Sequence, residues 1–161
     1  MDRLLKIGLG FSASVYMFFV IFNNLFDYDS NYQFINHIAS MSEVFNKQTN
    51  AWRSIQSAVF HHFMYVLIIL WEVFVFALLA IGTLQMFRSI KSDSVTFEEA
   101  KVKAKSGFVC GVILWFLVFV SVGGEWFLMW QSEKWNGQQN GFLLTICFLL
   151  FANYLNQREV S

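Results

Sequence analysis

Charged side chains are scarce in this 161-residue sequence, which argues against a water-soluble protein. Asp, Glu, Lys and Arg make up 14% of the residues, whereas they are about a quarter of an average soluble domain. A short chain has a large surface for its volume, and so few charges cannot cover it with polar groups. The net charge of zero also removes the positive field that nucleic-acid binding requires. The composition therefore argues against a soluble enzyme, a disordered protein and a nucleic-acid binder.

Proline is absent and cysteine is rare. Without proline, no helix is kinked by a missing backbone N–H, so a bend has to come from glycine, and Gly123-Gly124 is the best candidate. Cys110 and Cys147 are too few for a disulfide framework and lack metal-ligand spacing. The sequence has no phosphate-binding loop, nucleophile elbow, zinc-protease motif or dinucleotide fingerprint. We therefore expect no enzymatic activity, no metal and no cofactor.

Long apolar runs make up most of the chain, of which 57% is hydrophobic. A helix needs about 20 apolar residues to cross a bilayer. Four segments fit, at about 7–26, 57–87, 107–130 and 141–155. They do not alternate polar and apolar residues as the strands of a membrane barrel do. The sequence therefore predicts an all-α fold, a four-helix transmembrane bundle that forms one integral membrane domain over residues 1–161.

Basic residues are distributed unequally between the connecting segments. One set of segments holds eight of them: Arg3, Lys6, Arg88, Lys91, Lys101, Lys103, Lys105 and Arg158. The other set holds three: Lys47, Arg53 and Lys134. Because Lys and Arg accumulate on the cytoplasmic side of a membrane protein, both termini and the 88–105 segment are expected in the cytoplasm. Segments 27–56 and 131–140 are then outside.

Two connecting segments carry signs of helix. The outer segment 27–56 is long for a structureless connection, and we expect a short helix within 31–42. Thr96-Phe-Glu-Glu99 has the spacing of a capping box, which predicts a helix that starts there and continues into the third span. Gly107-xxx-Gly111 and Gly8-xxx-Ser12 have the small-residue spacing that lets helices approach closely inside a bundle.

Glu72 lies near the middle of the second predicted span, where a charged side chain is costly. No Lys or Arg lies within any of the four predicted spans. Glu72 therefore has to be protonated, hydrogen-bonded to another helix or exposed to a hydrated cavity. Two interpretations are open: a polar contact that joins helices, or a site for a proton, a cation or a polar ligand group.

His61 and Tyr65 share one face of the same helix with Glu72. The eleven positions from His61 to Glu72 correspond to about 16 Å of rise and only about 20° of rotation. Glu125, in the third predicted span, falls between them in depth. We therefore predict a polar pocket that opens outward around these four residues. Its other predicted members are hydrogen-bonding residues at the outer ends of the helices: Asn23, Asn24, Trp130 and Gln131.

Three stretches of the chain carry a resemblance to a known family. They are Asn23–Asn31 with Phe34–His37 and Ser40-Met41; then Arg53, His61-His62, Tyr65, Ile68-Ile69 and Glu72; and then Gly123–Gln138, which reads GGEWFLMWQSEKWNGQ. From about residue 15 to about residue 155 the chain resembles a bacterial family of predicted small integral membrane proteins of unknown function. Relatives often carry proline between Arg53 and the histidine pair, and this chain has none. The resemblance implies four spans and a bacterial inner membrane, but no catalytic residue, substrate or cofactor.

Three functions are compatible with these features. The small size favours a non-enzymatic accessory or self-associating subunit of an inner-membrane complex, whose partners are the lipid bilayer and other membrane subunits or its own copies. The second is a protein for proton- or cation-coupled transport or ligand binding that uses His61, Glu72 and Glu125. The third is a quinone-binding redox subunit, held by aromatic side chains, a carboxyl and a histidine. Haem is disfavoured because His61 and His62 lie on one helix.

Overall fold

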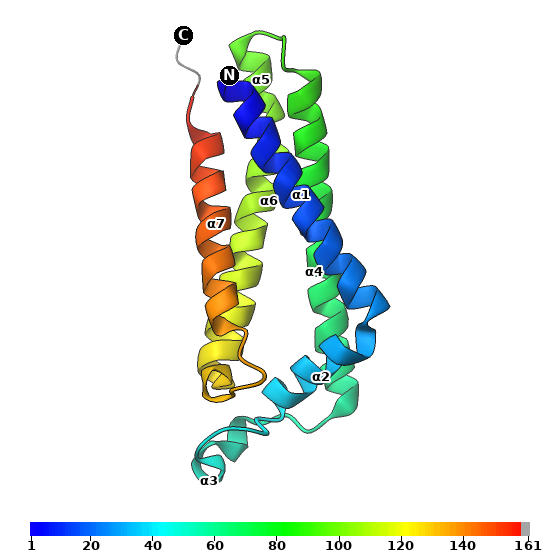
Figure 1. The fold of residues 1–161 in the computed structure, drawn as a ribbon, viewed down its shortest axis with the longest axis vertical. Helices are drawn as coiled ribbons and strands as arrows, with labels where there is room; N and C mark the ends of the chain where they lie inside the picture. Colours follow the sequence, from blue (N-terminus) through cyan, green and yellow to red (C-terminus); the bar gives the residue numbers. More distant parts are fainter. Residues whose placement is uncertain (159–161) are drawn as a thin grey trace.

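Four long helical segments run side by side along the molecule (Figure 1). The computed structural model describes residues 1–158. The long segments are α1 (Asp2–Phe26), α4 (Ala58–Arg88), the continuous pair α6 (Val102–Val112) and η2 (Ile113–Trp126), and α7 (Gln138–Asn156). The shorter helices are α2 (Tyr28–Ala39), α3 (Lys47–Asn50), η1 (Ala51–Arg53), α5 (Ser94–Ala100) and η3 (Met129–Gln131). No strand occurs within residues 1–158, so the all-α prediction is confirmed.

Three helices are long and apolar enough to cross a membrane: Asp2–Phe26, Ala58–Arg88 and Ser94–Trp126. They correspond to the first three predicted spans. The fourth predicted span corresponds to α7, which begins and ends in amide side chains and falls outside this set of three. The helical bundle is therefore observed, whereas the fourth crossing stays a prediction.

The third span ends earlier than the sequence suggested. Segment η2 is π-helical, and its last turn closes with a hydrogen bond from the Phe127 N–H to the Val122 oxygen, five residues back, at 3.0 Å. Leu128 then adopts a left-handed backbone conformation with φ 56°, which a bulky residue rarely adopts. The chain turns there, so the helix stops at Trp126 and not at 130. A wide helical segment that includes Gly123-Gly124 replaces the predicted glycine bend.

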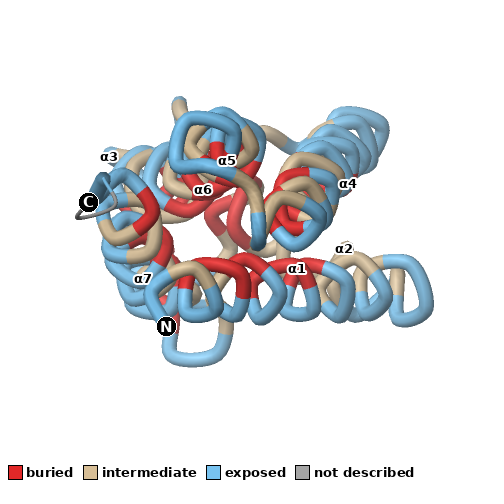
Figure 2. The backbone as a smooth tube through the Cα atoms, turned by 90° about the horizontal axis from the view of Figure 1, so that it is seen from above, coloured by how far each residue is buried: buried red, intermediate tan, exposed pale blue. Residues whose placement is uncertain are grey.

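The four long segments bury a common core. Helix α4 packs against α1 and α6, and α7 packs against α6 and η2. Viewed from one end, their buried residues face inward and their exposed residues face outward (Figure 2). Met17, Leu79, Phe108 and Phe148 are buried in this core, one from each long segment. Many large apolar residues remain exposed on the outside, as expected where lipid, and not water, surrounds the helices.

Small residues mark the closest approaches between helices. Gly107 lies against Leu79 of α4, and Gly111 lies against Phe148 of α7, so this predicted pair packs inside the bundle as expected. The prediction for Gly8-xxx-Ser12 is wrong, because a Cβ atom on Gly8 would meet nothing within 4 Å. These two positions lie on the exposed face of α1.

The long segment between α1 and α4 folds into a cap at one end of the bundle, and it contains the predicted short helix as α2. A second apolar cluster holds the cap together, and its members come from segments far apart in the chain. They are Ile38, Ala39, Met41, Val44, Phe127 and Met129. The cap therefore rests on the turn that follows η2.

The N-terminus, the C-terminal end of α7 and α5 lie at the opposite end from this cap (Figure 1). Helix α5 has its N-cap at Asp93, which accepts a hydrogen bond from the Thr96 backbone N–H at 3.0 Å. The predicted capping residue, Thr96, is thus inside the first turn, because Asp93 takes the cap position three residues earlier. This backbone hydrogen bond, helped by the Thr96 hydroxyl, lowers the pKa of Asp93 below its usual value.

Two lysines at this end of the bundle, Lys6 and Lys101, are fully buried. The Nζ atoms of Lys6 and Lys101 both donate to the Gln157 carbonyl oxygen, at 2.9 and 3.1 Å. Asp2 and Glu98 neutralise them as ion pairs. Carbonyls at the end of a helix lack partners within the helix and carry partial negative charge. The two lysines therefore bind the C-terminal end of α7 to α1 and α5–α6.

Candidate functional site

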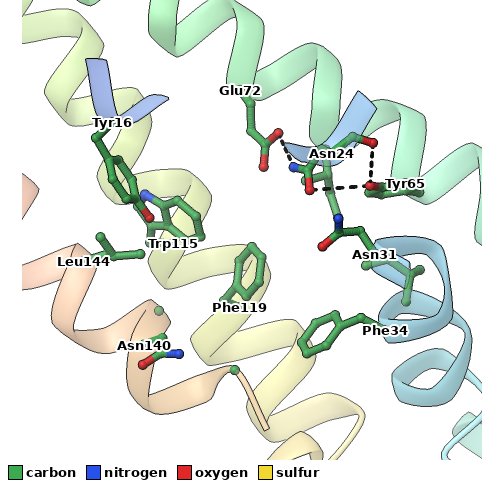
Figure 3. Close-up of a pocket in the computed structure, with 14 residues that line it drawn as sticks. Tyr16, Asn24, Asn31, Phe34, Tyr65, Glu72, Trp115, Phe119, Asn140 and Leu144 are labelled. Carbon is green, nitrogen blue, oxygen red and sulfur yellow. Dashed lines mark hydrogen bonds between the residues drawn. The ribbon is translucent and has the colours of Figure 1, made fainter. Parts of the chain in front are cut away.

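A cavity of about 270 Å³ lies within the half of the bundle nearer the cap (Figure 3). Five segments enclose it: α1, α2, α4, η2 and α7. Its polar and aromatic lining residues are Tyr16, Asn24, Asn31, Phe34, Tyr65, Glu72, Trp115, Phe119 and Asn140. Because every long segment contributes to it, the cavity depends on the assembly of the whole bundle.

One wall of the cavity is a hydrogen-bonded cluster of three predicted site residues. Asn24 of α1 donates from Nδ2 to Glu72 Oε2 of α4 at 2.7 Å. The Tyr65 hydroxyl donates to the Asn24 backbone oxygen at 2.9 Å. Tyr65 and Glu72 are seven positions apart, about two helical turns, so they present side chains on the same face of α4. Both are almost fully buried, at 2% and 1% exposed.

The opposite wall is aromatic and was not predicted as part of the site. Trp115 and Phe119, one turn apart in η2, have ring centroids 4.9 Å apart. Tyr16 of α1 lies 6.4 Å from the Trp115 ring, and the Asn140 amide of α7 lines the cavity nearby (Figure 3). The sequence signal was weak, because a tryptophan within a membrane span is read as one more apolar residue.

Trp115 also leaves a polar group without a partner. Trp115 is only 5% exposed. Its indole Nε1 is buried and makes no hydrogen bond within the described residues. Indole N–H groups usually find an acceptor when they are buried. This nitrogen is covered by neighbouring protein atoms and lies on the Tyr16 side of the ring (Figure 3), so Trp115 presents its aromatic ring, and not its N–H, to the cavity.

His61 is buried, as its place on the Glu72 face predicted, but it lies outside the cavity lining. Its Nε2 pairs with the Ile55 backbone oxygen at 2.8 Å, and its Nδ1 has no partner in the described residues. This contact binds the start of α4 to the segment that leads into it. His62 points to the exterior, where it stacks on Tyr32 and pairs with the Tyr28 hydroxyl.

Glu125 does not share the cavity with Glu72. It is exposed at the end of η2, and its Oε1 accepts a hydrogen bond from Gln138 Nε2 at 3.0 Å. The two carboxyls were expected to meet because they were close in depth. Depth in the membrane does not determine how a helix is rotated about its own axis. The π-helical turns of η2 direct Glu125 away from α4 and toward the first residues of α7.

The remaining predicted site residues also lie elsewhere. Trp130 and Gln131 both contact Phe45 in the cap. The Trp130 ring meets the Phe45 ring edge to face, and Gln131 Oε1 accepts a hydrogen bond from the Phe45 backbone N–H at 2.8 Å. The side chain of Asn23 is exposed, one position from the cavity-lining Asn24. The structure thus brings Asn24, Tyr65 and Glu72 together, and adds Asn31, Trp115 and Asn140, which the prediction did not include.

Comparisons with known proteins agree with a membrane protein. The family described as "Predicted small integral membrane protein (DUF2165)" matches residues 2–158. No curated protein and no solved structure matches the chain. Because the family match extends over almost the whole chain and every long helix within it, this protein belongs to the family of predicted small integral membrane proteins.

Proposed function

We propose that this protein is a non-enzymatic ligand-binding protein of the bacterial inner membrane, and that the cavity around Glu72 is its binding site. The observation that carries the proposal is the setting of Glu72. Glu72 is 1% exposed, it lines a cavity, and its carboxyl has Asn24 as its hydrogen-bond partner. A carboxyl at this depth is costly unless other groups satisfy it, and a bound ligand would supply such a group.

The proposal includes four crossings, with both termini in the cytoplasm. The eight-to-three excess of basic residues supports this orientation, and so does the position of the N-terminus, α5 and the C-terminal end of α7 at one end (Figure 1). The packing of α7 along α6 and η2 supports a fourth crossing. In this orientation the cap is outside, and the cavity lies in the outer half of the bundle.

Substitutions at Glu72 test whether its carboxyl forms the hydrogen bond with Asn24. Glu72→Gln keeps the shape and the hydrogen bond with Asn24, so the thermal unfolding midpoint in detergent should stay close to that of the wild type. Glu72→Ala leaves Asn24 unpaired and should destabilise the protein by about 1–3 kcal/mol. Equal stability of both variants would show that the Asn24 contact is not formed.

A binding screen then tests the function itself. Neutral, cationic, anionic and quinone-type small molecules are added to the purified protein, and the shift of the unfolding midpoint is measured. At least one class should stabilise the wild type and fail to stabilise Leu144→Trp, which fills the cavity from α7. Leu143→Trp, on the exposed side of the same helix, is the matched control. Absence of any such class would contradict the proposal.

An accessory-subunit role is a second candidate. The parts of the protein outside the long helices are small, which favours this role. The longest helix among these parts is α2, with 12 residues. Such a protein acts through its membrane-embedded surface. Mild solubilisation and mass measurement should then give a discrete complex, with its own copies or with another membrane protein. A monomer at all detergent concentrations would contradict this role.

A further inference from the structure

The chemistry of the cavity narrows the class of ligand, given that the proposed function is correct. The volume of about 270 Å³ is near the lower limit of small-molecule pockets, roughly 300 Å³. The cavity therefore suits a compact molecule of a few heavy atoms. A haem or a quinone with an isoprenoid tail is too large for it.

The charge of the lining selects against anions. Glu72 is the ionisable acid of the lining, and none of the described lining residues is Lys, Arg or His. An anionic ligand would meet a carboxyl and no positive charge at this depth. A cationic ligand would pair with Glu72 and relieve the cost of the buried carboxyl. A bare metal ion fits poorly, because no group of three or more His, Cys, Asp or Glu side chains is found in residues 1–158.

The shape of the lining selects an organic cation. Opposite Glu72, the rings of Tyr16, Trp115 and Phe119 form a continuous wall, with neighbouring centroids 6.4 and 4.9 Å apart. The faces of aromatic rings attract ammonium groups, and such walls recognise alkylated ammonium ions. A carboxyl on one side and aromatic rings on the other complement a cation that has an apolar surface (Figure 3).

The carboxyl of Glu72 and the aromatic wall together define the ligand. We propose that the cavity binds a small organic ammonium ion, with the ammonium group at Glu72 and its apolar surface against the rings of Tyr16, Trp115 and Phe119. A small amino alcohol is such an ion. The ligand can be a free amino alcohol, or it can be the ethanolamine headgroup of a membrane lipid.

The test measures binding of choline and ethanolamine to the full chain in dodecyl maltoside, an uncharged detergent, by isothermal titration calorimetry. The matched control ligand is the neutral isostere of choline, in which a tert-butyl group replaces the trimethylammonium group. At least one of the two ammonium compounds should bind, with a dissociation constant lower than that of the isostere by about tenfold or more. Equal affinity for choline and its isostere would overturn the ammonium assignment.

Three variants locate the binding. Glu72→Gln should weaken ammonium binding by about tenfold or more while its unfolding midpoint stays close to that of the wild type. Glu125→Gln removes an exposed carboxyl outside the cavity and should leave the affinity unchanged. Tyr16→Leu removes one ring of the aromatic wall and should weaken choline binding several-fold. Full affinity in Glu72→Gln would overturn the proposal, and full affinity in Tyr16→Leu would overturn the contact with the aromatic wall.

The results also separate this inference from the proposed function. If neither ammonium compound binds but another class in the screen does, the ammonium assignment is wrong and the binding function stands. If no class binds, both are wrong. To identify the source of the cation, choline affinity is compared in phosphatidylglycerol nanodiscs with and without phosphatidylethanolamine. A lipid headgroup as occupant predicts weaker choline binding when phosphatidylethanolamine is present, and a free amine predicts no change.

Discussion

Replacing Gly82 with alanine should loosen the contact between α4 and α6. A Cβ atom on Gly82 would overlap the backbone nitrogen, Cα and Cβ of Ala104. Ala104 is fully buried in the core, so it cannot move without a shift of the whole α6 helix. The substitution therefore meets backbone, and not the flexible end of a side chain.

Two opposite effects decide the magnitude. Alanine is better than glycine in a helix interior by about 1 kcal/mol. Overpacking a close contact costs about 1–3 kcal/mol, and a clash with backbone belongs at the upper end. The net expectation for Gly82→Ala is a destabilisation of about 2 kcal/mol. Gly8→Ala is the matched control, because a Cβ there meets nothing within 4 Å, and it should keep or raise the stability.

The assay is reversible unfolding of both variants and the wild type in the same detergent, followed by helical circular dichroism. Gly82→Ala should unfold at a lower temperature or denaturant concentration than the wild type, and Gly8→Ala should not. If Gly82→Ala were as stable as Gly8→Ala, the close approach of α4 and α6 would be refuted. The relative placement of Glu72 and Trp115 would be refuted as well, because Glu72 lies on α4 and Trp115 lies on η2, which continues α6.

Two further predictions concern the ends of the bundle. A cysteine at Lys47, in a variant without Cys110 and Cys147, should react with an impermeant thiol reagent in intact spheroplasts, and a cysteine at Ser92 should not; the reverse pattern would contradict the proposed orientation. The pKa of Asp93 is lowered in the folded protein. Its cap therefore gives its full stabilisation of the fold at pH values above the ordinary carboxyl pKa, and this stabilisation is lost as the pH falls through the lowered pKa. Asp93→Asn keeps a capping side chain and should reduce the acid sensitivity of the unfolding midpoint; an unchanged pH profile would show that Asp93 has no such role.

The sequence by itself determined the helices and their approximate ends, because apolar runs and capping residues act locally. The second span was predicted at 57–87 and is observed as Ala58–Arg88. The shared face of His61, Tyr65 and Glu72 was also predictable, since positions on one helix are related by its fixed rotation per residue. All three side chains are buried, as that face implied.

Only the tertiary structure decided which residues from different helices meet. These helices are apolar on nearly all sides, so the sequence does not encode which face of each turns inward. Depth alone paired Glu72 with Glu125, but the rotation of η2 exposes Glu125 and places Trp115 in the cavity lining. In the same way, the amide that reaches Glu72 is Asn24 and not its neighbour Asn23. Adjacent positions on a helix point about 100° apart, and the packing of α1 against α4 decided between them.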